Sequence, residues 1–121
     1  MGSTGNYLII QENGKENTVC LDSRSVWPVG RVSIAGEGIV LRSPTVSRQH
    51  GLFMNIMGTW YYYDKKCTNA TIYNGRKIKP GIGGRTRPVM LHDGDVLMLG
   101  ARSESSNDDK TVWIKYTEKA V

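Results

Sequence analysis

Short apolar runs, many of them alternating with polar residues, recur along the whole chain. Alternation with a period of two is typical of strands that bury one face. We therefore expect strands over these runs, with further short pieces on either side of Val32 and of Asn74-Gly75. The runs are Tyr7–Gln11, Thr18–Leu21, Gly38–Leu41, His50–Ile56, Thr59–Asp64, Val89–Leu91, Val96–Leu99 and Thr111–Tyr116.

Turn residues separate these runs every 8 to 12 positions. Asn-Gly at 13–14 and at 74–75 predicts two tight hairpins, and Met-Gly-Thr at 57–59 predicts another turn. No window has a period of 3.6, and 14 glycines disfavour long helices. We therefore predict an all-β chain folded as an antiparallel β-sandwich. One domain is expected over residues 6–118, after a leader of residues 1–5.

Composition narrows the class of protein. The 121 residues are 39% apolar and 22% charged, as in ordinary globular domains. No apolar run approaches the roughly 18 residues of a membrane span, and the start has no secretion signal. Cys20 and Cys67 lack Cys-x-x-Cys spacing, and only two histidines occur. We therefore expect reduced thiols in a cytoplasmic domain, with no metal, no cofactor and no membrane segment.

The net charge of +5 favours an acidic partner. Such a partner could be nucleic acid, an anionic membrane or a phosphorylated ligand. Alternatively, the basic residues form a solvated surface that binds no partner. No run of lysine or arginine exceeds two residues, and the basic residues are scattered. This scatter disfavours nucleic-acid binding.

Ser47 and His50 stand three positions apart, which raises the question of catalysis. A serine nucleophile needs a histidine within hydrogen-bond reach and a carboxylate that orients this histidine. The sequence contains no Gly-x-Ser-x-Gly elbow and indicates no particular carboxylate. We therefore predict that the chain is not an enzyme.

Three loops carry groups suited to a phosphate. Arg31 follows a glycine, Ser47 and Arg48 lie in a second loop, and Thr68 and Asn69 lie in a third. A phosphate with a charge near −2 favours bidentate arginine, hydroxyl or N–H donors, and no neighbouring carboxylate. None of these residues is adjacent in sequence to Asp or Glu. Taken singly, most of these residues are better explained as an ordinary surface charge, turn hydroxyl or turn former.

Four motifs in order add a family to this picture: "VGR" at 29–31, "VSRQHG" at 46–51, "TNATIYNG" at 68–75 and "LHDGDVLMLG" at 91–100. Together they closely resemble the forkhead-associated domain, a reader of phosphothreonine peptides. The resemblance runs from Val29 to Gly100. It implies a sandwich of about 11 strands with the binding loops at one end.

The resemblance also implies roles for individual residues. Contacts with the phosphate would come from Arg31, Ser47, Arg48 and Thr68. Asn69 would hydrogen-bond the backbone of the bound peptide. Structural roles would fall to Gly30, His50, Asn74 and Gly75, with the imidazole bracing its loop rather than acting as a base.

The sequence departs from the family pattern at three places. Ala70 replaces the usual glycine after the asparagine, and the basic loop 79–88 is longer than usual. Thr45 stands where some members carry a basic side chain that selects the third residue after the phosphothreonine. A threonine there disfavours a strong preference for an acidic residue.

We therefore predict a non-catalytic module that binds a phosphothreonine-containing protein or peptide. Its partner would be a protein phosphorylated by a Ser/Thr kinase. The phosphorylated segment would belong either to another protein or to the same polypeptide. The main alternative is a scaffold domain that makes phosphate-independent protein contacts. Nucleic-acid binding and hydrolysis are the remaining alternatives. Steeply salt-dependent binding would indicate nucleic-acid binding. Ester turnover that is lost in Ser47→Ala would indicate hydrolysis.

Overall fold

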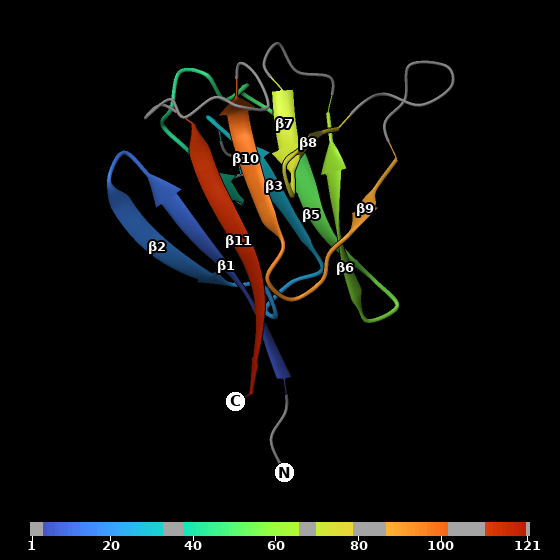
Figure 1. The fold of residues 1–121 in the computed structure, drawn as a ribbon. Coiled ribbons are helices and arrows are strands. Elements are labelled where there is room, and N and C mark those ends of the chain that lie inside the picture. The colour runs from blue at the N-terminus through green and yellow to red at the C-terminus, as the bar shows by residue number, and fades with distance from the viewer. Residues whose placement is uncertain (1–3, 33–37, 66–69, 79–86, 102–110, 121) are drawn as a thin grey trace.

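The computed structural model describes residues 4–32, 38–65, 70–78, 87–101 and 111–120, to which all structural statements refer. Within them, eleven strands form two sheets that pack face to face, and no helix occurs (Figure 1). In this part of the chain there is accordingly no apolar helix long enough to cross a membrane. The predicted all-β sandwich is confirmed.

The first sheet contains six strands, and each pair of neighbouring strands in it is antiparallel. In spatial order they are β2 (Lys15–Cys20), β1 (Thr4–Glu12), β11 (Val112–Ala120), β10 (Val96–Ala101), β7 (Ala70–Tyr73) and β8 (Arg76–Lys77). Thr4 pairs with Ala120, so β1 takes in two residues that the sequence suggested as a leader.

The second sheet contains five strands. In spatial order they are β4 (Ile39–Val40), β3 (Val26–Gly30), β5 (Gly51–Ile56), β6 (Thr59–Asp64) and β9 (Val89–Met90). One pair, β3 with β4, is parallel, and the other pairs are antiparallel. Sequence analysis expected short strands on either side of Val32: the one before it is present as β3, which ends at Gly30, and residues 33–37 after it lie outside the described residues.

The predicted hairpin turns are present. Asn13, Met57 and Asn74 have φ values of 53°, 52° and 47°, and each precedes a glycine with positive φ. Successive positive φ angles give a turn whose twist matches that of the flanking strands. These three turns fix the registers of β1 with β2, β5 with β6, and β7 with β8.

The core lies between the sheets and follows the alternation in the sequence. In β6, Trp60 and Tyr62 point inward and are 2% and 0% exposed, whereas Tyr61 and Tyr63 are only half-buried. Both sheets contribute to one apolar cluster, which includes Leu8, Ile10, Val29, Phe53, Leu97, Leu99, Ile114 and Tyr116.

The start of β1 and the end of β11 lie at one end of the sandwich, and the connection from β4 to β5 crosses the other (Figure 1). This connection, residues 41–50, contains the second predicted binding loop, residues 42–49, with Ser47 and Arg48. Because β3 ends and β5 begins beside it, the fold brings Arg31 to the same end as Ser47 and Arg48.

Candidate functional site

Backbone hydrogen bonds join the end of β3 to the 42–49 loop. The N–H of Arg31 donates to the carbonyl of Ser47 over 3.1 Å, and the N–H of Val32 donates to that of Arg48 over 3.3 Å. Gly30 is buried beneath this crossing, and its φ is not positive. A methyl group on Gly30 would overlap the Arg48 carbonyl group and lie only 2.8 Å from its carbon atom. Space alone therefore requires glycine here.

The Arg31 side chain is exposed and held by one of its nitrogens. Its Nε donates to the carbonyl of Val46 over 2.6 Å. The two terminal nitrogens have no partner among the described residues, and no described carboxylate forms an ion pair with Arg31. The anchored guanidinium thus keeps its planar fork available for a bidentate anion.

Ser47 and Arg48 present further donors beside Arg31. Ser47 is half-buried, and its hydroxyl has no hydrogen-bond partner among the described residues. Arg48 is exposed, and no described Asp or Glu forms an ion pair with it. Two guanidinium groups and a hydroxyl are therefore gathered at the end of the sandwich.

A buried hydrogen-bond chain supports the loop from below. The N–H of Ser47 donates to Nδ1 of His50 over 3.1 Å, so the imidazole carries its proton on Nε2. Nε2 lies 2.8 Å from Thr71 Oγ1, and the Thr71 hydroxyl in turn donates to Asp64 Oδ1 over 2.6 Å. Tyr62 donates to the same carboxylate oxygen over 2.8 Å. The chain links the loop to β6 and β7.

These hydrogen bonds of His50 also bear on the question of catalysis. His50 is 0% exposed, and both of its ring nitrogens are already used, one by the backbone of Ser47 and one by Thr71. Asp64 lies 3.9 Å from Nε2, but burial lowers the pKa of His50 to about 4, so the imidazole is neutral near pH 7. The arrangement supplies no base to the Ser47 hydroxyl.

The free energy of unfolding is expected to fall as the pH is lowered from about 6.5 to about 4. Burial lowers the pKa of His50 from 6.5 to about 4, so the unfolded chain binds more protons than the folded protein in this window. Stability is fully present above pH 6.5, and the loss is complete below about pH 4. This pKa difference corresponds to roughly 3 kcal/mol.

Asp64 acts in the opposite sense. Burial raises its pKa, so the folded protein binds more protons at this carboxyl, and acidification adds to stability there. Denaturant melts between pH 4 and pH 7, run on wild type and on His50→Gln, separate the two groups. The free energy of unfolding of the wild type minus that of His50→Gln should grow as the pH rises across this window. Parallel pH profiles of the two proteins would contradict the assignment of the pH dependence to His50.

Two of the predicted site residues, Thr68 and Asn69, lie outside the described residues, and their roles stay predictions. The residues that flank this segment are ordered around the site. The N–H of Lys65 donates to the His50 carbonyl over 3.0 Å, and its Nζ donates to Gln49 over 3.0 Å. β7 begins at Ala70 on the same end of the sandwich (Figure 1).

Asn74 and Gly75 lie elsewhere, at the end of β7 away from Ala70. The Asn74 amide donates to Asp95 over 3.0 Å, and its carbonyl oxygen accepts the N–H of Val96 over 2.8 Å. Tyr73 also donates to Asp95. These contacts tie the β7–β8 turn to the start of β10, which suits the structural role that the resemblance implied.

Sequence reasoning missed Glu12, which anchors the loop from the β1–β2 hairpin. Its carboxylate accepts the N–H groups of Arg42 and Ser43 over 2.8 and 2.9 Å. A cavity of about 660 Å³ lies between the hairpin and this part of the loop. No local signal identifies Glu12, because it stands 30 residues before its partner.

Thr45 is buried, contrary to its expected place beside the peptide. It is 9% exposed, its hydroxyl lies 2.9 Å from that of Ser43, and it packs against Gly100. Because Gly100 has no side chain, Thr45 can turn inward instead of outward. It is therefore not placed to select a residue of a bound peptide.

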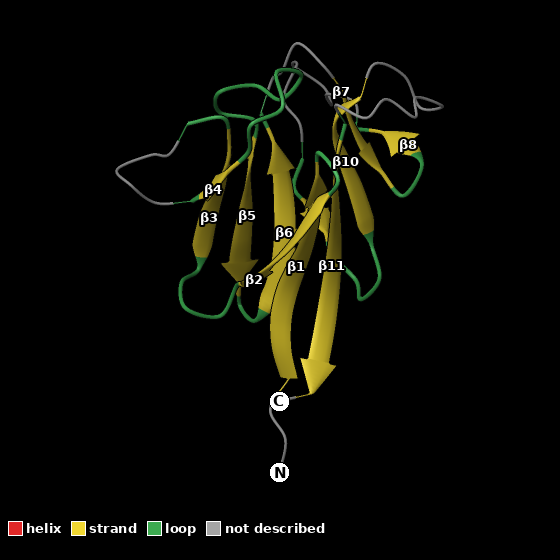
Figure 2. Cartoon of the chain, turned by 90° about the vertical axis from the view of Figure 1, so that its left-hand side faces the viewer, coloured by secondary structure: helices red, strands yellow, loops and turns green. Residues whose placement is uncertain are grey.

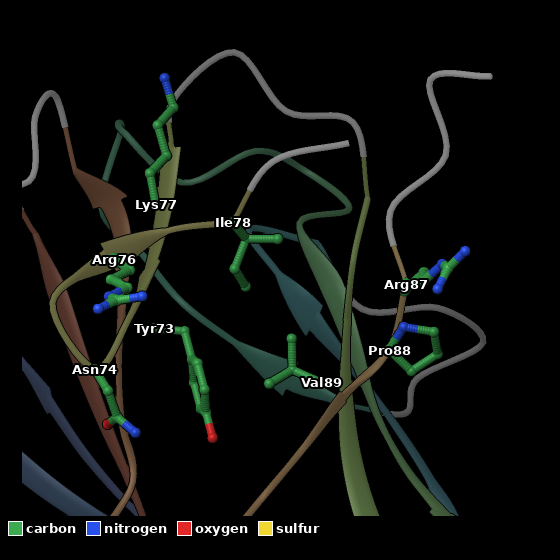
Figure 3. Close-up of a pocket in the computed structure, with 8 residues that line it drawn as sticks. All are labelled: Tyr73, Asn74, Arg76, Lys77, Ile78, Arg87, Pro88 and Val89. Carbon is green, nitrogen blue, oxygen red and sulfur yellow. The ribbon is translucent and has the colours of Figure 1, made fainter. Parts of the chain in front are cut away.

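A second cavity, of about 460 Å³, lies between the β7–β8 hairpin and the entry to β9 (Figure 3). Ile78, Val89 and the ring of Tyr73 surround its middle, while the charged ends of Lys77 and Arg87 lie at its outside. Its lining does not include Arg31 or Ser47. Most of the basic loop 79–88, namely residues 79–86, lies outside the described residues.

Solved structures with this fold include forkhead-associated domains. Full-length yeast Pml1p shares 27% identity, with a TM-score of 0.73 over 96% of this chain and 83% of that one. The forkhead-associated domain of an Arabidopsis thaliana hypothetical protein shares 22%, with a TM-score of 0.73 over 95% and 86%. That of yeast Dun1, solved with a doubly phosphorylated phosphothreonine peptide derived from Rad53, shares 20%, with a TM-score of 0.67 over 98% and 77%.

No curated protein sequence matched the chain. The family model for the FHA domain does match, over residues 24–100, which is well over half of the sequence. This range contains the whole of the described cluster at Arg31, Ser47, Arg48 and His50. Domains of this family are generally non-catalytic interaction modules, in keeping with an imidazole that is unavailable to Ser47. The chain belongs to the forkhead-associated domain family.

Proposed function

We propose that this domain binds phosphothreonine-containing peptides of a partner protein, and that Arg31, Ser47 and Arg48 hold the phosphate. The observation that carries the proposal is the convergence of a serine hydroxyl and two guanidinium groups, neither of which pairs with a described carboxylate, at one end of the sandwich. A phosphate of charge near −2 takes bidentate arginine and hydroxyl donors. The phosphothreonine peptide bound to the Dun1 domain supports the same ligand class.

The loop is organised to present these donors without rearrangement. Its backbone is bonded to β3, its start to Glu12, and Ser47 to the buried imidazole of His50. Fixed donors lose little conformational entropy when a ligand docks. By the family resemblance, Thr68 would add a phosphate contact and Asn69 would hold the peptide backbone.

The proposed partner is a protein phosphorylated by a Ser/Thr kinase, either a separate chain or another segment of the same polypeptide. The net charge of +5 assists the approach of such a dianionic ligand. A scaffold that makes only phosphate-independent contacts would not need two exposed arginines with which no carboxylate in the described ranges forms an ion pair. Titration with one peptide, with and without its phosphate, separates these functions.

The domain is expected to prefer phosphothreonine to phosphoserine in an otherwise identical peptide. Burying one methyl group contributes about 0.8 kcal/mol, or roughly fourfold in affinity. The β-branch also restricts χ1, so phosphothreonine loses less rotamer freedom on docking. Calorimetric titration of the two phosphopeptides measures the ratio.

Two further peptides complete the test. A glutamate at the same position should bind poorly, because it offers one charge and a planar carboxylate in place of a tetrahedral phosphate. The unphosphorylated peptide should not bind measurably. Equal affinity for phosphothreonine and phosphoserine would reject a pocket for the methyl group, and tight binding of the unphosphorylated peptide would reject phosphate recognition itself.

A further inference from the structure

The cavity between the β7–β8 hairpin and the entry to β9 lies where the edges of the two sheets meet. β8 is the last strand of the six-stranded sheet, and β9 is the last strand of the five-stranded sheet (Figure 2). The described strands therefore leave the cavity uncovered on this side. Its volume of about 460 Å³ falls within the range of about 300–1,000 Å³ that is usual for ligand pockets.

Apolar side chains from both sheets form the middle of this cavity (Figure 3). Ile78, just after β8, and Tyr73 on β7 come from one side, and Val89 on β9 comes from the other. Each of the three is half-buried. The ring of Tyr73 is held in place, because its hydroxyl donates to Asp95 and lies 3.1 Å from the Met90 carbonyl oxygen. The middle of the cavity is thus ready to receive an apolar side chain.

The outside of the cavity is basic. The charged ends of Lys77 and Arg87 lie there, and both side chains are exposed (Figure 3). No described Asp or Glu forms an ion pair with either residue, and none belongs to the described lining. Along the sequence, residues 77–88 contain four Lys or Arg and no Asp or Glu. An apolar middle inside a positive rim favours an occupant whose apolar side chain is flanked by carboxylates.

Such an occupant is held by its side chains rather than by joining a sheet. β8 and β9 contain two residues each, too few to form a ladder with an added strand. A nucleic acid would need exposed aromatic faces on which its bases stack. The described lining offers only the ring of Tyr73, which is half-buried and fixed by its hydroxyl. An acidic peptide is therefore the class of ligand that suits this cavity.

Strand register places the cavity within reach of a peptide held at Arg31. Val89 pairs with Tyr62 on β6. Tyr62 pairs with Phe53, which pairs with Trp27 on β3, three strands away from β9. Arg31 follows Trp27 by four residues, so three steps of about 4.8 Å and four residues of about 3.3 Å put it roughly 20 Å from Val89. An extended peptide covers this span in about six residues.

Hydrogen bonds also connect the cavity to the loop of Ser47. The N–H of Ile78 donates to the Thr71 carbonyl over 2.9 Å. The Thr71 hydroxyl is the group that lies 2.8 Å from Nε2 of His50, and Nδ1 of His50 accepts the N–H of Ser47. The cavity and the loop are therefore fixed to the same buried residues, which keeps their spacing constant when a peptide docks.

We propose that this cavity binds an apolar side chain flanked by acidic residues, about six residues from the phosphothreonine on the same partner peptide. The apolar side chain inserts between Ile78 and Val89, and the carboxylates pair with Lys77 and Arg87. A second contact on one peptide raises the affinity, because the short linker holds it at an effective concentration in the millimolar range. The link to phosphothreonine rests on the proposed function, whereas binding of an acidic peptide in the cavity does not.

An unphosphorylated peptide with one leucine between glutamates tests the cavity by itself. At millimolar peptide, the methyl NMR signals of Ile78 and Val89 should shift. The same peptide with serine in place of leucine should leave them unchanged. Arg87→Glu alters an exposed side chain, so it should fold normally and abolish the shifts.

The matched control is Lys115→Glu, which reverses the same charge at an exposed position on β11 in the other part of the six-stranded sheet. It should keep the shifts of the wild type. Absence of shifts in the wild type would overturn the proposal, whatever the phosphothreonine site does. Equal loss in Arg87→Glu and Lys115→Glu would overturn it too, because net charge alone would then explain the binding.

Calorimetry at physiological salt tests the link between the two sites. A short phosphothreonine peptide is compared with two longer peptides that carry Glu-Leu-Glu about six residues before or after the phosphothreonine. One longer peptide should bind the wild type about fivefold more tightly or better, and this gain should vanish in Arg87→Glu. The short peptide should bind both proteins alike, because roughly 20 Å exceeds the Debye length of about 8 Å.

The outcomes separate this inference from the proposed function. If neither longer peptide gained affinity over a short peptide that binds, the two contacts would not share one partner, and that part of the proposal would be overturned. A short peptide that failed to bind would contradict the proposed function and the link together. The methyl titration would still decide whether the cavity takes an acidic peptide.

Discussion

Arg31→Ala is expected to remove most measurable binding of a phosphothreonine peptide while the domain stays folded. Loss of a charge-assisted, partly desolvated contact costs about 2–5 kcal/mol, which is roughly 30-fold or more in affinity. The folded state loses only the bond from Nε to the Val46 carbonyl, worth about 1 kcal/mol. Calorimetric titration at neutral pH measures the first effect, and a denaturant melt measures the second.

Two variants separate the guanidinium fork from net charge. Arg31→Lys keeps the charge but cannot form a bidentate pair, so it should also bind poorly. Arg76→Ala removes one positive charge from an exposed position on β8, remote from the loop, and should bind nearly as the wild type does. Wild-type affinity in Arg31→Ala would sink the proposed phosphate site.

Gly30→Ala is expected to reduce both stability and phosphopeptide affinity. The added methyl group would overlap the Arg48 carbonyl and come within 3.0 Å of the Ser47 oxygen, and both are backbone atoms that no rotamer change can move aside. Overpacking of this kind costs about 1–3 kcal/mol and often more. Relief requires the loop to move away from β3, which displaces Ser47 and Arg48 from Arg31.

Gly58→Ala provides the control. Gly58 lies in the β5–β6 turn with φ of 88° and open space around its Cα, so alanine there adds only backbone strain. Its stability should fall by about 1 kcal/mol, and its affinity for phosphopeptide should not change. Urea melts and phosphopeptide titrations of both variants measure these effects. If Gly30→Ala kept wild-type stability and affinity, the close approach of β3 to the loop would not be the reason that glycine is needed at position 30.

Local patterns were sufficient for most of the fold. Asn13-Gly14 and Asn74-Gly75 predicted hairpins because these residues adopt positive φ at low cost, and the turns are present. The run from Thr59 to Asp64 alternates as predicted, with Trp60 and Tyr62 inside. Turn chemistry and period-two alternation depend on neighbours in sequence, so they can be recognised without the tertiary structure.

β3 was predicted only as a short piece before Val32, without bounds, and the reason is equally local. Pro28 has no N–H to donate and normally marks an edge strand or a loop, and Gly30 weakens a strand pattern further. In the fold, Pro28 nevertheless pairs with Leu52 in the interior of the sheet order. Its neighbour Val29 enters the core, and burial there outweighs the poor strand propensity.

For the candidate site, sequence supplied the residues and structure supplied their relations. Arg31, Ser47, Arg48 and His50 were named from residue chemistry and the family resemblance. The order of donors from Ser47 through His50 and Thr71 to Asp64 was not predictable, because these residues come from the loop and from two different strands. Their functional roles stay predictions for the titrations and melts described above.

The sequence by itself determined most of the strands, the turns and the family, and it named the residues predicted to hold a phosphate, because each depends on local chemistry or on motifs read in order. Tertiary structure alone decided that Thr45 turns inward, that Glu12 anchors the loop, and that Gly30 must lack a side chain. It also decided that Ile78, next to β8, and Val89, on β9, line one cavity with a basic rim. These facts depend on strand order and register, which hydrophobic alternation along one strand does not specify.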